Sequence, residues 1–433
     1  MRRPPRVLIF TTINWAATAQ LGLALIAKGF EVGSIAPGDH GICTVSGIKA
    51  HFRSVSYSAT GSFVASVIER WPPDIVIPCD DIATCCLHDL YAKASKGRGH
   101  NPETIKTIIE NSLGDPASYS IAQKKSEFIS FAEREGLPVP STIAINHQED
   151  LAAQLERSGF PQVLKLDRTS SGLGVRIVNN QDDAHRAYRD LVAMFGWLRA
   201  TKRALKQLSL EPFARRWKEP TPVITLQRYI AGVPANRSVL CWKGEILAGL
   251  SVEALKTAHA TGPATVIRIL DNAGMDEAAR HVVRRLGLSG FVGFDFILEV
   301  ASGRPFLIEM NPRPTPICHF SFDAQTDMTG ALFTQLTAGK TCESAMQSAG
   351  KVIALFPAEF WRDPHSEYLQ SGYNDAPLQE PQLIDAYSHP VSPHSLSWIS
   401  RLCFQFFDAL LVSTSSRLSA LIRFLTAEHE PTK

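Results

Sequence analysis

Short apolar runs alternate with amphipathic segments over the first hundred residues of the chain. Residues 7–10 read Val-Leu-Ile-Phe and predict a buried strand, and residues 16–28 predict a helix that ends at a glycine. A second buried strand is expected at 74–78, followed by a helix over 82–92. Strands that alternate with helices predict a parallel sheet, in which ligands bind at the carboxyl ends of the strands.

The loops after these two strands bear on ligand binding. Residues 11–15 read Thr-Thr-Ile-Asn-Trp, without the Gly-x-Gly-x-x-Gly pattern that lets a backbone approach a pyrophosphate. A dinucleotide-binding oxidoreductase is therefore disfavoured. Asp80 and Asp81 stand at the end of the other strand. Capping of the following helix is their first expected role, and binding of a substrate amine or hydroxyl is the alternative.

Further along the chain, an alternating strand precedes a turn of small residues. Residues 162–167 read Gln-Val-Leu-Lys-Leu-Asp, with Leu164 and Leu166 on one face and Lys165 on the other. A lysine in mid-strand needs an anionic partner, or else extends its ammonium to water. The Ser/Gly turn over 170–174 offers backbone N–H groups that can surround a phosphate. This unit alone favours a phosphate-binding loop and an ordinary hairpin equally.

Two more alternating strands form the most specific pattern in the sequence. Residues 292–299 and 306–313 flank an Ala-Ser-Gly turn, which predicts a hairpin. A turn centred on the serine places Asp295 directly opposite Glu309, with Asn311 on the same face. These oxygen donors suit Mg²⁺, an ion that itself holds phosphates, and an exposed hairpin with chance acids is the weaker alternative. The opposite face is expected to belong to the core: Phe294, Phe296, Ile308 and Met310.

Composition narrows the class of protein. The 433 residues carry 44 basic and 42 acidic side chains, a net charge of +2 that disfavours a dedicated nucleic-acid binder. Hydrophobic residues make up 45% and charged residues 20%, as in a globular chain of about three packing units. The basic segment 201–219 predicts a solvated helical face, with a phosphate or nucleic-acid role as the alternative.

Cysteines and apolar runs suggest the compartment. Eight cysteines are scattered along the chain without a Cys-x-x-Cys pair, which favours reduced thiols in a cytoplasmic protein over a zinc site. The run at 7–10 is too short for a signal peptide or a membrane span. Gln405 and Asp408 interrupt the apolar residues 402–412, so no transmembrane segment is expected.

The lysine strand with its small-residue turn, together with the hairpin that ends in Glu-Met-Asn-Pro-Arg, resembles the ATP-grasp superfamily. The metal-binding hairpin of that superfamily commonly ends in Glu-x-Asn-x-Arg. The chain is similar to carboxylate–amine ligases and to the ATP-grasp domains of carbamoyl-phosphate synthase and biotin carboxylase. The resemblance covers roughly 115–335 and implies an α/β fold. We expect an N-terminal parallel-sheet βα domain at 1–115, an α+β ATP-grasp domain at 116–340, and a C-terminal extension with a helical tail at 341–433.

The resemblance also implies roles for individual residues, and it implies ATP and Mg²⁺ as cofactors, with Mn²⁺ as an alternative ion. Arg313 would be the catalytic group that steadies the reacting phosphate and acyl groups, and Asp295, Glu309 and Asn311 would be the metal ligands. Lys124 is the fallback for the first lysine of the nucleotide site. The implied ATP-binding residues are Lys125, Lys165, Ser170, Ser171, Gly172, Gly174, Gln227, Tyr229 and Ile230.

The sequence departs from the superfamily pattern where the ribose would bind. Many members have a glutamate after the glycine at the position of Gly232, whereas this chain reads Val-Pro-Ala over 233–235. Arg228 stands where an acidic residue is frequent. The ribose contact is therefore unassigned. At position 295 an aspartate replaces the more common glutamate, which keeps the charge but shortens the reach.

Superfamily members typically phosphorylate a carboxylate with ATP and then let a nucleophile displace the phosphate. The leading hypothesis is a carboxylate–amine ligase with small-molecule carboxylate and amine substrates. Carboxyphosphate or carbamoyl chemistry, and a nucleotide-sensing binding protein without catalysis, are the alternatives. His319 is expected to be structural, with the acceptor site as its alternative, and residues 361–364 to begin an extended stretch. The helical tail at 396–427 is expected to pack on the body, with a homodimer contact or a membrane surface as alternatives.

Overall fold

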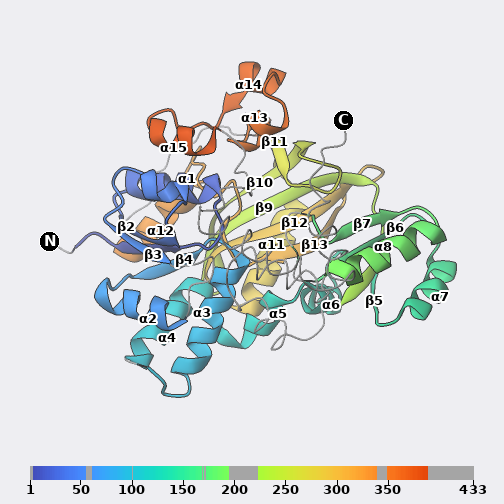
Figure 1. Cartoon of the computed structure of the whole chain (residues 1–433), viewed down its shortest axis with the longest axis horizontal. Coiled ribbons are helices and arrows are strands. Elements are labelled where there is room, and N and C mark those ends of the chain that lie inside the picture. The colour runs from blue at the N-terminus through green and yellow to red at the C-terminus, as the bar shows by residue number, and fades with distance from the viewer. Residues whose placement is uncertain are drawn as a thin grey trace, which may run out of the picture. The chain divides into compact units, whose positions relative to one another are not determined.

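The N-terminal sheet is parallel, which confirms the expectation from alternating strands and helices. In the computed structural model its strands are β1 (Arg6–Phe10), β2 (Glu31–Pro37), β3 (Ala50–Ser54) and β4 (Ile75–Pro78), in the order β3-β2-β1-β4 (Figure 1). Alternate residues of β1 face two cores, because successive side chains of a strand point to opposite faces. Val7 and Ile9 belong to a core that includes side chains of a first helix, and Leu8 and Phe10 to a core that includes side chains of three more. These helices are α1 (Ala16–Ala27), and α2 (Gly61–Arg70), α3 (Asp81–Ala94) and α4 (Pro102–Leu113).

The structure describes residues 3–54, 61–99, 101–167, 169, 172–194, 223–338 and 349–388. By their contacts, residues 1–184 and 223–389 form one unit, and 185–222 with 390–433 form another. Everything below concerns the first unit. The basic segment 201–219, the helical tail at 396–427, and the two serines Ser170 and Ser171 lie outside the described residues.

A smaller antiparallel sheet follows, in the order β5-β8-β6-β7. Its strands are β5 (Thr142–Ile145), β6 (Gln162–Leu166), β7 (Val175–Val178) and β8 (Ile224–Arg228). The lysine strand is β6, so the Ser/Gly turn connects two paired strands. The helices of this region are α5 (Tyr119–Gln123), α6 (Lys125–Arg134) and α7 (Gln148–Ser158), and the 3-10 turns of the unit are η1 (Gly41–Thr44) and η2 (Pro116–Ser118). The next helix, α8 (Gln181–Met194), begins in this unit and continues into the other one from His185.

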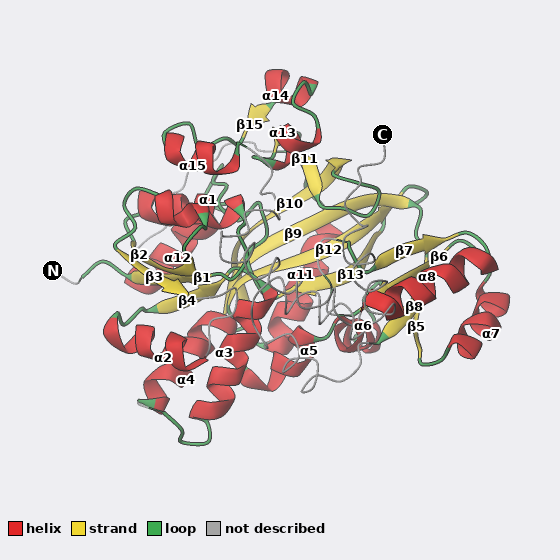
Figure 2. Ribbon diagram, viewed as in Figure 1, coloured by secondary structure: helices red, strands yellow, loops and turns green. Residues whose placement is uncertain are grey.

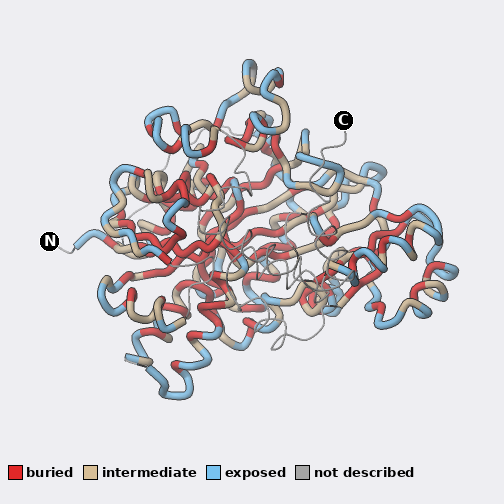
Figure 3. The backbone as a smooth tube through the Cα atoms, viewed as in Figure 1, coloured by how far each residue is buried: buried red, intermediate tan, exposed pale blue. Residues whose placement is uncertain are grey.

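A seven-stranded sheet carries the predicted hairpin at one edge (Figure 2). Its strands, in spatial order, are β13 (Pro305–Asn311), β12 (Gly290–Glu299), β9 (Gly232–Trp242), β10 (Glu245–Thr257), β11 (Ala264–Ile269), β14 (Val352–Ala354) and β15 (Tyr373–Asn374). Side chains of α6 and α11 (Ala273–Leu286) share one core with the sheet, and those of α1 and α12 (Met328–Thr337) share another. Figure 3 shows buried positions along β9 and β12. The apolar face of the hairpin is thus packed against α6 and α11.

The last described segment belongs to the same unit, since β14 pairs with β11 and β15 pairs with β14. The helices after β14 are α13 (Ala358–Arg362), α14 (Glu367–Ser371) and α15 (Pro381–Tyr387). The expectation of an extended stretch from Trp361 is wrong at its start, because Trp361 and Arg362 end α13. The buried carboxylate of Glu359 holds that helix by accepting from Arg362 Nε at 2.7 Å.

No helix in the described part of the chain combines the length and the apolarity needed to cross a bilayer.

Candidate active site

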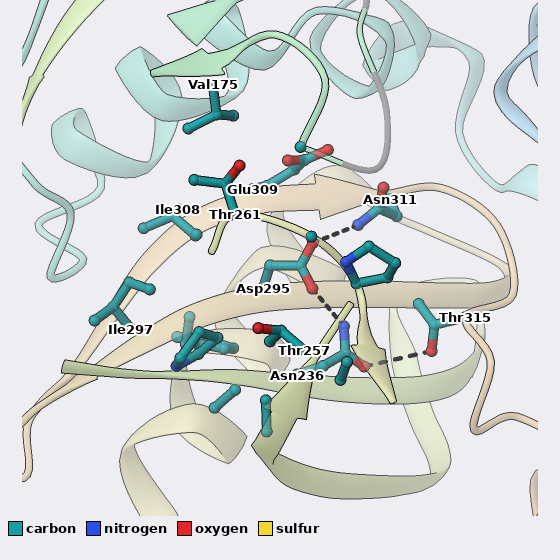
Figure 4. A pocket seen from close by; sticks show the side chains of 18 of the residues that line it. Val175, Asn236, Thr257, Thr261, Asp295, Ile297, Ile308, Glu309, Asn311 and Thr315 are labelled. Carbon is teal, nitrogen blue, oxygen red and sulfur yellow. Dashed lines mark hydrogen bonds between the residues drawn. The ribbon is translucent and has the colours of Figure 1, made fainter. Parts of the chain in front are cut away.

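A cavity of about 860 Å³ is lined by residues of both the small and the seven-stranded sheet (Figure 4). Ser170 and Ser171 fall outside the described residues, and Gly174 packs against Thr169 beside the cavity. The structure brings ten of the sequence-predicted site residues to this one cavity: Lys125, Lys165, Gly172, Gln227, Tyr229, Ile230, Asp295, Glu309, Asn311 and Arg313.

The hairpin register confirms the predicted pairing, with Asp295 directly opposite Glu309. The register shifts by one residue between Asp295 and Phe296, so that Phe296 faces Leu307. Because of this bulge, the side chain of Ile308 does not join the core. The expectation that Ile308 belongs to the core is wrong, because it lines the cavity together with Ile297 (Figure 4). Phe294, Phe296 and Met310 are buried as expected.

Asp295 lies at the centre of an amide-rich network. Its two carboxylate oxygens accept from Asn236 Nδ2 at 2.6 Å and from Asn311 Nδ2 at 2.8 Å. Burial, followed by repulsion from Glu309, raises the pKa of Asp295 to about 6, although both amides oppose that rise. Sequence reasoning missed Asn236, because nothing local shows that β9 pairs with β12 and sets it opposite Asp295.

Two lysines face these acids. Lys125 Nζ lies 2.7 Å from Glu309 Oε1, and it also donates to the carbonyl of Thr169. Burial lowers the pKa of Lys165 to about 8, while Glu309 raises that pKa and Lys125 lowers it. Lys124 pairs instead with Glu127 on its own helix, which favours Lys125 over the fallback. The positive charges of the two lysines therefore offset the negative charges of Asp295 and Glu309 in the cavity.

These two pKa shifts predict a bell-shaped dependence of kcat/KM for ATP on pH, since kcat/KM reports the free enzyme. As pH falls below about 6, Asp295 takes up a proton and loses its attraction for a cation. As pH rises above about 8, Lys165 loses the charge that attracts phosphate. Steady-state rates between pH 5.5 and 9 test this. Lys165→Arg should remove the basic limb because a guanidinium stays charged. A flat wild-type profile would contradict the assignment of these charges.

Gly172, the first described residue of the Ser/Gly turn after Ser171, lies against the loop between β10 and β11. Gly172 has a φ of +74°, and a Cβ on it would lie 1.9 Å from the carbonyl oxygen of Thr261. Position 172 therefore requires glycine for two reasons. Residues with a side chain rarely adopt a positive φ, and a Cβ here would collide with a backbone atom. The turn thus depends on a close backbone approach at the cavity.

Gly172→Ala should push the turn away from Thr261 and raise the KM for ATP about tenfold or more. Gly136→Ala is the matched control, because Gly136 has a φ of +75° with no atom within 4 Å of the added Cβ. That control should cost about 1 kcal/mol of stability and leave the KM for ATP unchanged. Nucleotide titration and thermal unfolding of both variants separate the two effects. Equal KM values in both variants would count against a role for the turn.

Arg313 is buried where the N-terminal sheet meets the hairpin. Its Nε donates to Asp81 Oδ1 at 2.6 Å, and a terminal nitrogen donates to Asn311 Oδ1 at 3.2 Å. The guanidinium lies 5.1 Å from the ring centroid of Trp15. The two adjacent acids therefore differ: Asp80 caps α3 and accepts from Thr12 Oγ1 at 2.9 Å, whereas Asp81 pairs with Arg313.

The end of the cavity next to the small sheet is mostly apolar. Tyr229 and Ile230 line it where β8 leads into β9, and Ile297 and Ile308 face them from the hairpin. Gln227 is buried, and its amide nitrogen donates to Thr142 Oγ1 at 2.9 Å, so this side chain is already bonded. Such a surface suits a flat heterocycle better than a charged group.

His319 is not among the residues that line the cavity. Its Nε2 lies 2.8 Å from Asp375 Oδ1, in the segment that follows β15. This contact favours the structural role expected for His319 over the acceptor site.

The donor set of the hairpin fits a divalent cation. Mg²⁺ takes oxygen ligands and usually only a few from protein, with phosphates and water supplying the rest. Among the described residues no three His, Cys, Asp or Glu side chains converge on one point, so Asp295 and Glu309 need the amide oxygen of Asn311 and a phosphate to complete a site. The mutual repulsion that raises the pKa of Asp295 is the force that a bound cation would relieve.

Comparisons with known proteins agree with this geometry. Residues 206–316 match the family model of the ATP-grasp domain. The carbamoyl phosphate synthase large chain of Methanothermobacter thermautotrophicus is 22% identical over 319 residues, which cover 72% of this chain and 27% of that protein. The chain thus spans about a quarter of the length of this curated relative.

Two solved structures share the fold. The biotin carboxylase domain of Hydrogenobacter thermophilus 2-oxoglutarate carboxylase, in complex with MgADP, ADP and bicarbonate, has a TM-score of 0.57 at 15% identity, covering 81% of this chain and 74% of that one. The L-amino acid ligase of Bacillus licheniformis has a TM-score of 0.52 at 15% identity, covering 81% and 80%. Residues 206–316 thus match an ATP-grasp domain, and the chain shares its fold with these two solved structures.

Proposed function

We propose that this chain is an ATP-dependent ligase that activates a carboxylate as an acyl phosphate for attack by an amine. One observation carries the proposal: Lys125 and Lys165 face the carboxylates of Asp295 and Glu309 in a single cavity. Phosphoryl transfer needs mainly positioning and compensation of negative charge. This cavity offers cations for phosphates and oxygen donors for the ion that accompanies them.

Each residue has a definite task in this proposal. Asp295, Glu309 and Asn311 would hold Mg²⁺, or Mn²⁺ as an alternative, and the bound ion would neutralise charge on the transferred phosphate. Lys125 and Lys165 would bind the ATP phosphates once these anions replace the present contacts with Glu309. The Gly172 turn would cover the phosphates. Arg313 would steady the carboxylate and the phosphate that it receives.

The proposed reaction has two balanced steps. A carboxylate oxygen attacks the γ-phosphorus of ATP, the bond to the bridging oxygen breaks, and ADP leaves with that electron pair. The amine then attacks the acyl carbon, the carbon–nitrogen bond forms, and phosphate leaves as the amine loses a proton.

Hydroxylamine tests this chemistry without knowledge of the natural amine, because it converts an acyl phosphate into a stable hydroxamate. The full chain is incubated with ATP, Mg²⁺, hydroxylamine and a panel of carboxylates, and ADP and hydroxamate are measured together. Equal amounts of both products are expected for at least one carboxylate. Nucleotide binding without ADP release over the whole panel would favour a binding protein without catalysis.

Carboxyphosphate chemistry is the second candidate, and the fold favours it through the relative that was solved with MgADP and bicarbonate. Bicarbonate would then take the place of the carboxylate substrate. Labelled bicarbonate separates the two candidates, since ADP release that depends on bicarbonate, with label in the product, would replace the first proposal. Either activity would take place in the cytoplasm, where ATP is available. Association of two copies of this chain into a homodimer is a further part of the proposal.

A further inference from the structure

The cavity continues well beyond the residues assigned to ATP. From the hairpin it crosses the face of the seven-stranded sheet, past Asn236 on β9, Val252 on β10 and Ile267 on β11, to Leu355 after β14. Four strand spacings separate β12 from β14, which corresponds to about 19 Å at the usual distance between strands. This length leaves room for a substrate group beyond the phosphates.

Aromatic side chains outside the residues assigned to ATP also line the cavity. We call Trp15, Phe356 and Trp361 the aromatic wall; all three line the cavity. Trp361 is 37% exposed although it is large and apolar, and its indole N–H already donates to the carbonyl of Tyr387 at 3.0 Å. Its open face therefore offers apolar surface without an unmet hydrogen bond.

The aromatic wall is held in place by one buried side chain. Tyr387 is fully buried; its carbonyl accepts from Trp361, and its hydroxyl donates to Asn14, the residue before Trp15. The Tyr387 ring also meets that of Phe356 edge to face, with centroids 6.4 Å apart. Because contacts with one buried tyrosine hold this wall in place, its side chains are already ordered. Ligand binding should therefore cost little side-chain conformational entropy.

The charged side chains near the aromatic wall favour an uncharged ligand group over a positively charged one. Among the described residues that line the cavity, the acids are Asp295 and Glu309 on the hairpin and Asp167, which directly follows β6. Arg362 also lines the cavity, but it forms an ion pair with the buried Glu359, in which Arg362 Nε donates to Glu359 Oε2 at 2.7 Å. Arg313, stacked on Trp15, is the cation that adjoins the wall. Among the described residues that line the cavity, no carboxylate is therefore left beside the wall to pair with a positively charged substrate group.

We propose that the aromatic wall binds a bulky apolar or aromatic side group of the carboxylate substrate, whose carboxylate lies at Arg313. This inference rests on the proposed function and adds the substrate class. The carboxylate is chosen over the amine because Trp15 contacts Arg313 directly, so the wall begins at the group that would hold the carboxylate.

The test uses the hydroxylamine assay on the full chain. The carboxylates carry methyl, isobutyl, benzyl, aminobutyl or carboxyethyl side groups, each with and without an α-amino group. We expect kcat/KM to be highest for benzyl or isobutyl and at least about tenfold lower for methyl and for both charged groups. A maximum for a charged or a methyl side group would overturn the inference while leaving the ligase intact. Absence of hydroxamate with every carboxylate would instead overturn the proposed function.

A pair of neighbouring substitutions tests the aromatic wall itself. Trp361→Ala should raise the KM for the benzyl carboxylate about tenfold, with the KM for ATP and the rate with the methyl carboxylate unchanged. Phe360→Ala is the matched control, since Phe360 is the adjacent residue of α13, 42% exposed and absent from the cavity lining. Trp361→Phe should restore most of the affinity, which distinguishes ligand contact from damage to the fold. Equal effects of Trp361→Ala and Phe360→Ala would overturn the assignment.

Discussion

Glu309→Gln should lower kcat for ADP release by about 10³-fold, because the change removes one of the two charges that we propose hold the cation at the transferred phosphate. The amide keeps the shape of the side chain, so the hairpin should stay folded. The variant also leaves Lys125 without the carboxylate that now lies 2.7 Å from its ammonium. Turnover is measured as ADP and hydroxamate over a range of Mg²⁺ concentrations.

Glu299→Gln is the matched control, since Glu299 lies on the partner strand β12, at the turn end of the same hairpin, and accepts from Ser302 Oγ at 2.6 Å. Its activity should equal that of the wild type. Glu309→Asp keeps the charge but shortens the reach, so intermediate turnover that recovers at high Mg²⁺ is expected. Near-normal ADP release by Glu309→Gln, with substrate present, would contradict the metal assignment.

The sequence predicted the parts of this site that depend on local geometry. The two-residue period and the short turn were enough to pair Asp295 with Glu309, as the register shows. The bulge at Ile308 was not visible, because one extra residue leaves the apolar pattern unchanged while it turns a single side chain toward the cavity. Local rules thus located the acids but not the apolar surface beside them.

Sequence patterns could not predict contacts between segments that lie far apart in the chain. Asn236 reaches Asp295 because β9 and β12 pair, although 59 residues separate them in the chain. Trp361 joins the cavity only because β14 extends the same sheet and Tyr387 ties the end of α15 to the loop after β1. No periodicity in either segment indicates such a partner. Single-sequence patterns therefore predicted the residues proposed for the nucleotide far better than those proposed for the substrate.

The second large effect is expected for Arg313→Met, with a fall in kcat of about 10²-fold to 10³-fold and little change in the KM for ATP. Arg313 contacts Asp81, Asn311 and Trp15, whereas Lys125 and Lys165 provide the charges proposed for the ATP phosphates. Its loss should therefore act on the acyl transfer and on the KM for the carboxylate.

Two variants and one control separate charge from geometry at this position. Arg313→Lys keeps the charge but loses the planar fork that can bond Asp81 and a ligand together, so kcat should stay at least tenfold below wild type. Arg304→Met, on the exposed turn of the same hairpin, should leave all constants unchanged, because this arginine lies over Phe306, which is not among the residues lining the cavity. If Arg313→Met raised the KM for ATP and left kcat intact, Arg313 would be a nucleotide-binding residue, and the substrate carboxylate would have to bind elsewhere in the cavity.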